Sequence, residues 1–386
     1  MTVDFSPSAE AVDIRRQARQ FLESHLPEDL AEAVYRSGVS HEPAFARALA
    51  ERGWLPRGSG DREGDALDLE TAAALEDELS KAEAPTYALA TTMMVVRVLT
   101  AVGSPELKAE VVPTALTGQR TIALGLSEPE AGSDVAAVRT RARRDGTEWV
   151  VDGQKMFTTN GHVTDYVFLL ARTNPDVPNH RGLTTFLVPL DTPGIQAQAV
   201  YTLSGERTNI MYYDGVRLDD RWRIGEVDDG WGVLMLFLQD EHSAGFSAHL
   251  ARLLDETEAW AHDPAGDGTR PIDDPDVAER LARAATDLEV SQLLEQRSTW
   301  LTTIGQVPVA EGPMAKLFGT EALVRQAEQL TELVGPDALR SRLDPTAVRG
   351  GIIEHSLRFS LGTTIYAGTS EIQRNIIAQR ACGLPR

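Results

Sequence analysis

Several features that place a protein in a particular class are scarce in this sequence. It contains a single cysteine, Cys382, so no disulfide can form within the chain. Its longest strongly apolar run, residues 233–238, is far shorter than the roughly 20 residues that span a bilayer. The first residues lack the basic and apolar regions of a secretory signal. These absences predict a cytoplasmic protein without disulfides or membrane-spanning helices.

Basic side chains are also fewer than acidic ones. The chain has 58 acidic and 37 basic side chains, which give a formal net charge of −21. Because such a charge repels nucleic acid and anionic membranes, we expect neither as a partner. A phosphate-bearing ligand such as coenzyme A would need a local site of arginines and backbone amides. Metal-ligand spacing is missing as well, since His242 and His249 have no supporting carboxylate or thiolate pattern.

The periodicity of apolar residues divides the chain into three parts. Helical spacing dominates residues 1–120, short β-type runs with Gly, Pro and Asn turns occupy residues 121–227, and helical spacing returns over residues 228–386. A loop rich in Pro, Asp and Gly, between residues 262 and 275, interrupts the third part. A chain of 386 residues with 42% hydrophobic side chains predicts two or three packed units.

Three segments contain residue types that suit ligand binding. Residues 126–134 are rich in turns, small side chains and hydroxyls, which allow a planar ligand to approach the backbone. Residues 152–161 deliver an aromatic ring and two hydroxyls from a strand to a turn. Residues 365–378 turn at Gly368 and then read as a helix that Thr369 or Ser370 caps. Each segment alone is equally typical of an ordinary turn or helix start.

In this order and spacing, the three segments resemble the acyl-CoA dehydrogenase family. The resemblance extends from about residue 103 to residue 386 and is looser in the N-terminal helices. It includes Gly-Ser-Pro-Glu-Leu-Lys at 103–108, Phe-Leu-Val-Pro at 186–189 and Gly-Trp at 230–231. The resemblance implies an α+β multidomain fold with an N-terminal α-helical domain, a central β-barrel and a C-terminal four-helix bundle. It also implies FAD held between barrel and bundle, commonly in a homotetramer.

The resemblance further implies a cofactor site, residue by residue. Phe157 would pack on the isoalloxazine ring, and Thr159 would approach its N5 atom. Aromatic and aliphatic walls suit a neutral flavin ring, while a donor at N5 supports the charge that arrives with hydride. The full set of predicted cofactor-binding residues is Leu124, Leu126, Ser127, Gly132, Ser133, Phe157, Thr159, Thr369 and Glu371.

Removal of the α-proton of a thioester requires a carboxylate base. Many family members carry this base immediately before the Gly-Thr of the tail motif, but here that position is Ala367, which cannot accept a proton. A subset of the family places the base on the first long helix after the β domain, and the matching residue is Glu241. Glu241 also shares an apolar helical stripe with Leu234 and Ala248, where a carboxylate is costly unless it is paired or functional.

The sequence therefore predicts FAD-dependent α,β-dehydrogenation of a fatty or branched acyl thioester, acyl-CoA to trans-2-enoyl-CoA. The α-proton would pass to Glu241 and the β-hydride to flavin N5. The acyl group would be carried by CoA or by an acyl-carrier protein, and an electron-transfer flavoprotein would take the electrons.

Two alternatives stay open at this point. Ala367, and residues 268–271 in place of an Arg-x-x-Phe-Gly segment that many relatives use to hold FAD, also fit a flavin-poor or non-catalytic partner subunit of a hetero-oligomer. Glu241 would then be structural, beside His242 where the family usually has Arg. A flavin-dependent oxygenase on the same scaffold would likewise need no α-proton base.

Overall fold

The computed structural model describes residues 5–55, 67–241, 246–264, 266 and 268–385, with residues 239–241 described by their backbone alone. The chain forms two compact units. One comprises residues 1–16, 69–82 and 242–386, and is called the bundle unit below; the other comprises residues 17–68 and 83–241, and is called the sheet unit. The three-domain division at residues 120 and 227 stays a prediction.

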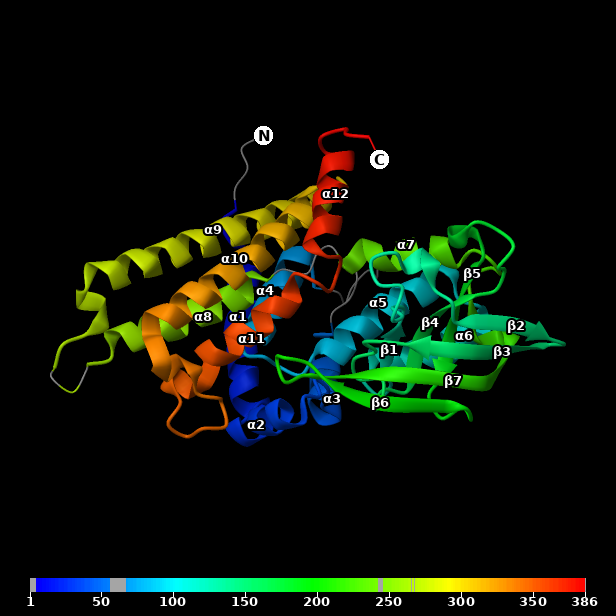
Figure 1. The fold of residues 1–386 in the computed structure, drawn as a ribbon, viewed down its shortest axis with the longest axis horizontal. Coiled ribbons are helices and arrows are strands. Elements are labelled where there is room, and N and C mark those ends of the chain that lie inside the picture. Colours follow the sequence, from blue (N-terminus) through cyan, green and yellow to red (C-terminus); the bar gives the residue numbers. More distant parts are fainter. Residues whose placement is uncertain (1–4, 56–66, 242–245, 265, 267, 386) are drawn as a thin grey trace. The chain divides into compact units, whose positions relative to one another are not determined.

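A mixed β-sheet forms the centre of the sheet unit (Figure 1). The strands pair in the order β6-β7-β3-β2-β4-β5-β8, and β1 pairs in parallel with β4. The β-type runs of the sequence fall in β3, β4 and β5, as predicted. The strands are β1 (Ile122–Gly125), β2 (Arg141–Asp145), β3 (Glu148–Lys155), β4 (Tyr166–Arg172), β5 (Leu183–Pro189), β6 (Ile195–Tyr201), β7 (Arg207–Asp219) and β8 (Arg223–Ile224).

The core of the sheet unit explains why β4 is apolar along its whole length. Every residue of β4 is buried, which is typical of a strand covered on both faces. Val167 and Leu169 join the core cluster on one face with Trp149. On the other face, the ring of Phe168 stacks on Phe237, with the ring centres 5.5 Å apart. Phe237 belongs to α7 (Gly230–Glu241), so this contact packs α7 against the sheet.

The further helices of the sheet unit are α2 (Glu28–Ser37), α3 (Pro43–Glu51), α5 (Tyr87–Val102) and α6 (Pro105–Leu116). Of these, α3 and α6 begin with a side-chain cap. The Glu42 carboxylate accepts a hydrogen bond from Phe45 N and caps α3. Ser104 caps α6 in the same way by accepting from Leu107 N at 3.1 Å.

The bundle unit is helical. Leu253, Leu281 and Leu323 lie in its shared core, and the predicted interruption between residues 262 and 275 is confirmed, because one helix ends at His262 and the next begins at Pro275. Figure 1 shows α8, α9 and α10 running alongside one another. The helices that lie wholly in this unit are α4 (Leu69–Lys81), α8 (Ser247–His262), α9 (Pro275–Thr303), α10 (Glu311–Val334), α11 (Ile352–Thr363) and α12 (Ser370–Arg380); α1 (Ala9–His25) contributes its first half.

Within the described ranges, no helix combines the length and the apolar character needed to cross a bilayer. Nor do these ranges contain a group of three or more His, Cys, Asp or Glu side chains placed to hold a metal ion.

Candidate active site

The first two predicted flavin segments meet at the end of β3. Met156 N donates a hydrogen bond to Ser127 O at 2.9 Å. The Lys155 ammonium reaches the same segment and donates to Leu126 O at 3.0 Å. These bonds join residues that are about 30 positions apart in the sequence, so the predicted cofactor residues of the sheet unit come from one connected surface.

A buried ion pair stabilises this junction. Lys155 is fully buried, and its Nζ lies 2.8 Å from Oε1 of Glu128. The Glu128 carboxylate also accepts from the backbone N–H groups of Arg139 and Thr140, at 2.6 and 2.9 Å. Burial raises the pKa of Glu128, but the Lys155 ammonium and these donors outweigh burial and hold that pKa below its usual value. Burial lowers the pKa of Lys155 to about 8, against the opposing effect of Glu128.

The turn after β3 exposes the predicted ring-packing residue. Phe157 has a φ of +61°, in the left-handed region, and its side chain is 58% exposed. A bulky residue at positive φ is rare and is concentrated at functional sites. Thr158 is fully buried behind the turn, and the Thr159 hydroxyl donates to the Thr208 hydroxyl at 3.2 Å.

Exposure separates the predicted ligand-facing residues from the scaffold around them. Gly132, Ser133 and Phe157 are exposed, and Leu124, Leu126, Ser127 and Thr159 keep partial exposure. A Cβ added at Gly132 would meet no atom within 4 Å, so the backbone is open to a ligand there. Glu128 and Lys155, which lie between these residues in the sequence, are buried. The exposed groups are free to contact a flat ligand, while the buried groups between them form a rigid support.

The tail motif lies in the bundle unit. The Thr369 hydroxyl accepts from Ile372 N at 3.3 Å and caps α12, as predicted. Ahead of the cap, Ala367 has a φ of +54°. The buried Lys316 ammonium donates to Gly368 O at 2.7 Å, and the Gln373 amide donates to Ala367 O at 2.9 Å.

Glu371 follows the Thr369 cap and is exposed. Hydrogen bonds from its own backbone N–H and from the Thr369 hydroxyl lower its pKa.

Glu241 is the last residue of α7, and both its side chain and all of His242 lie outside the described residues. The predicted apolar stripe around it is wrong as a feature of one helix. Leu234 is buried on α7, but Ala248 belongs to α8, which begins only at Ser247. The apolar periodicity of the sequence runs on from residues 230–241 into residues 247–262 because each segment forms a helix with apolar side chains, α7 and α8.

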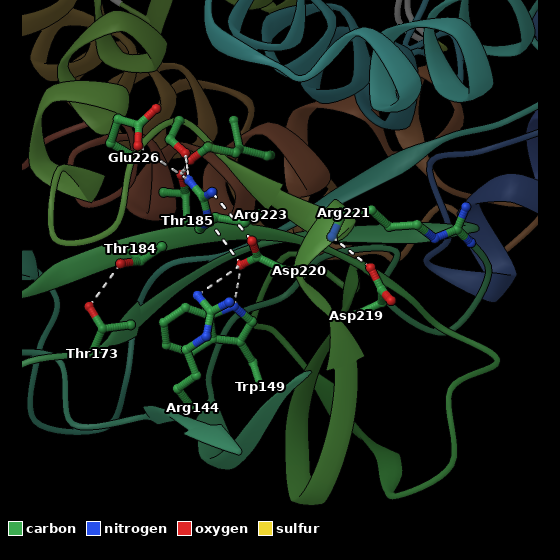
Figure 2. Close-up of polar contacts among 12 residues, drawn as sticks. Arg144, Trp149, Thr173, Thr184, Thr185, Asp219, Asp220, Arg221, Arg223 and Glu226 are labelled. Atoms are coloured by element: carbon green, nitrogen blue, oxygen red, sulfur yellow. Dashed lines mark hydrogen bonds and ion pairs between the residues drawn. The ribbon is translucent and has the colours of Figure 1, made fainter. Parts of the chain in front are cut away.

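The entry to α7 is held by polar contacts at the edge of the sheet. Asp228 N donates to the Thr184 hydroxyl at 2.9 Å. That hydroxyl lies 2.8 Å from the Thr173 hydroxyl, as Figure 2 shows. Asp228 itself has a φ of +65°. These bonds tie the start of α7 to β5, so the helix that ends at Glu241 leaves the sheet from a defined point.

Asp220 is the second anchor at this edge. It accepts from Trp149 Nε1 at 2.7 Å and from Arg223 Nε at 3.1 Å, as Figure 2 shows. Burial raises the pKa of Asp220, but these hydrogen bonds outweigh it and hold the pKa below its usual value. The anchor joins β3 to the chain that leads into α7.

The same edge borders a polar groove of about 480 Å³. Its charged side chains are already engaged: Arg223 with Asp220, and Arg221 with Glu110 at 2.9 Å. Such a lining does not suit an acyl chain, so we do not assign the substrate to this groove.

An acidic residue of the bundle unit that the sequence did not reveal is Glu295 on α9. Its carboxylate accepts from the backbone N–H groups of Phe246 and Ser247, at 3.0 and 3.1 Å, and from the Ser247 hydroxyl at 2.5 Å. Phe246 makes no side-chain cap of its own at the start of α8, so Glu295 supplies the missing acceptor. Burial raises the pKa of Glu295 to about 7. No local motif marks this residue.

Comparisons with known proteins agree with this architecture. Family models for the N-terminal, middle and C-terminal domains of acyl-CoA dehydrogenases match residues 8–119, 123–216 and 228–382. The acyl-CoA dehydrogenase FadE26 of Mycobacterium tuberculosis is 34% identical over 406 residues, covering 100% of this chain and 99% of its own.

Solved structures give the same result. The "Tcur3481-Tcur3483 steroid ACAD" has a TM-score of 0.92 at 30% identity, and the ChsE4-ChsE5 complex of M. tuberculosis has a TM-score of 0.90 at 31% identity. Both alignments cover 100% of each chain. An N-terminal helical part, a central sheet and a C-terminal helical part thus define an acyl-CoA dehydrogenase fold.

The chain belongs to the acyl-CoA dehydrogenase family. It is accordingly an oxidoreductase that acts on acyl-CoA compounds, in a family that depends on FAD.

Proposed function

We propose that this chain catalyses α,β-dehydrogenation of an acyl thioester to the trans-2-enoyl thioester, with FAD as its cofactor and Glu241 as its base. The observation that carries the proposal is the Phe157 turn, where an exposed aromatic ring is held at positive φ beside accessible backbone and hydroxyl groups. A positive φ is an energetically costly conformation for Phe, and exposing its ring to water is unfavourable as well. A flat ligand that covers the ring removes the second of these costs.

The residues of the sheet unit fit a flavin. Phe157 offers a face for the ring system, Gly132 leaves room for close approach, and Ser127 and Ser133 offer hydroxyls. When bound, the flavin supplies the acceptor for the β-hydride. Thr369 and Glu371, from the tail motif, are proposed as further contacts to the cofactor.

Glu241 is proposed to take the α-proton because Ala367, at the position that many relatives use, has no acceptor group. Its place in the chain supports this role, because Glu241 lies on α7, the first long helix after the β domain, where a subset of the family carries the base.

The acyl group is proposed to be a bulky one. One structural relative is described as a steroid ACAD, which favours a steroid side-chain thioester over a short straight chain. An electron-transfer flavoprotein remains the proposed electron acceptor.

A hetero-oligomer is the second candidate arrangement, because two relatives were solved as two-component proteins, Tcur3481-Tcur3483 and ChsE4-ChsE5. The bundle unit also exposes large apolar side chains, which is typical of an interface. They lie on α9, on α10 and in the turn between them: Val290, Leu293, Ile304, Val307, Val309 and Met314. Carrying Glu241, this chain would be the subunit that supplies the base.

The test is to purify the chain, alone and with a related dehydrogenase subunit, and to record the flavin absorbance. Straight, branched and steroid side-chain acyl-CoAs are then added without oxygen while the flavin band is followed. We expect bleaching by one acyl class and slowing of about 10²–10⁴-fold in Glu241→Gln, the usual contribution of a general base.

Asp240→Asn is the matched control, because it neutralises the neighbouring carboxylate without removing the proposed base. Undiminished bleaching in Glu241→Gln would exclude Glu241 as the base. Absence of flavin from both preparations would exclude the proposed function, whereas flavin only in the mixed preparation would establish the hetero-oligomer.

A further inference from the structure

The Phe157 turn is held at both of its flanks by other segments of the sheet unit. On one side, Met156 N donates to Ser127 O at 2.9 Å. On the other side, Thr158 N donates to the backbone carbonyl of Asn209, on β7, at 3.0 Å. Phe157 therefore lies between two anchored neighbours.

The strand register explains why Asn209 lies at this point. β3 and β7 pair up to Lys155 and Met211, and the same register continued by two residues would place Phe157 opposite Asn209. The ladder stops before that pair, and the backbone of Phe157 turns into the left-handed region instead. On its β3 side, Asn209 then bonds with Thr158 in place of a ladder partner, while on its other side it stays paired with Ala199 of β6.

The Asn209 side chain adds a second bond to the same residue. Its amide nitrogen donates to Thr158 O at 3.0 Å, so both main-chain groups of Thr158 are bound to Asn209. Asn209 is fully buried. The Thr158 carbonyl also accepts from Gly161 N at 3.1 Å, so loss of the Asn209 amide removes one of its two buried hydrogen bonds.

Neighbouring groups fix the orientation of the Asn209 amide. Arg207 donates to its Oδ1 at 3.3 Å, while its Nδ2 lies 3.1 Å from His162 Nδ1 as well as close to Thr158 O. The oxygen therefore faces a cation and the nitrogen faces acceptors. An aspartate here would place a carboxylate oxygen against the Thr158 carbonyl, where the amide nitrogen now donates.

Two local bonds lie within the turn itself: Thr159 N donates to Phe157 O at 3.0 Å, and Gly161 N donates to Thr158 O at 3.1 Å. The Phe157 ring is largely exposed, so packing within the described residues does not determine its backbone angle. A residue at positive φ persists only where its surroundings impose that conformation. The two bonds between Asn209 and Thr158, and the one between Met156 and Ser127, are the contacts beside Phe157 that tie the turn to other segments of the sheet unit.

We propose that Asn209 is a positioning residue that holds the Phe157 ring and the Thr159 hydroxyl in the arrangement that receives the flavin. The inference rests on the proposed function, because it assigns the turn to the cofactor. Asn209 does not touch the flavin and acts only through the backbone of the turn.

The test compares Asn209→Asp and Asn209→Ser with wild type. The first keeps the size of the side chain, and the second removes the amide and shortens the side chain without adding charge. Asn179→Asp is the matched control, since it makes the same amide-to-acid change at an exposed site. The measurements are the Kd of the apoprotein for FAD, the visible circular dichroism of bound flavin, and hydrogen exchange of residues 156–164 in the apoprotein.

We expect both Asn209 variants to raise the Kd for FAD about tenfold, the scale of one lost buried hydrogen bond. The circular dichroism band of the remaining bound flavin should change, and exchange in residues 156–164 should accelerate, whereas Asn179→Asp should match wild type. A merely structural role would not alter the flavin band of the fraction that stays folded.

The inference is overturned if either variant folds, binds FAD within twofold of wild type and leaves the flavin band unchanged. Faster exchange without any change in flavin binding would overturn it too. A wild-type chain that binds no FAD, alone or with a partner subunit, would overturn the proposed function and this inference together.

Discussion

Lys155 and Glu128 form a buried ion pair, and replacing only one of them leaves the other charge unpaired. Each single replacement should therefore lower the free energy of unfolding by more than half of what the double replacement costs. The pair joins the two predicted flavin segments at a distance of 2.8 Å, with Lys155 fully buried. Removing one partner of such a pair costs about 3–5 kcal/mol, because the other charge is left buried and unpaired. Lys155→Met should fall at the lower end, since Glu128 keeps two backbone N–H donors.

The assay is a double-mutant cycle with Lys155→Met, Glu128→Gln and the double variant, followed by urea unfolding at pH 7. The double variant should lose at least about 1 kcal/mol less than the sum of the single losses.

Arg217→Met is the matched control, because Arg217 and Glu148 form an exposed ion pair at 2.9 Å in the same sheet. Exposed pairs contribute about 0–1 kcal/mol. The reasoning is refuted if the losses of the single variants add to within about 0.5 kcal/mol, or if Lys155→Met costs no more than Arg217→Met.

Two further predictions concern the bundle unit. Burial raises the pKa of Glu295 to about 7, from 4.5 in an unfolded chain. Between these two pH values the folded state binds a proton that the unfolded state has lost. The free energy of unfolding therefore falls as the pH rises through this range. Glu295→Gln should flatten the decline of the unfolding temperature between pH 5 and about 7; an unchanged decline would contradict this. Lys316→Met removes the donor 2.7 Å from Gly368 O. In urea titrations, the free energy of unfolding should fall by about 1–3 kcal/mol. A variant as stable as wild type would contradict this prediction.

Features that depend only on residues close together in the sequence were predictable. The strands β3, β4 and β5, the break between α8 and α9 and the Thr369 cap all follow from local periodicity, turn residues and capping chemistry. The family and its three-part fold followed from the order of the motifs. Where periodicity was followed too far, as in the stripe from Leu234 to Ala248, the prediction failed, because spacing alone does not show where one helix stops and another begins.

The supports of the site were decided only by the tertiary structure. Glu128 meets Lys155 across 27 residues, Glu295 reaches Ser247 across 48, and Asn209 reaches Thr158 across 51. Each is a polar side chain whose partner depends on strand register or helix packing, and no local pattern carries that information. The sequence by itself predicted which residues would present a surface to the cofactor, whereas the fold decided which buried groups hold those segments in place.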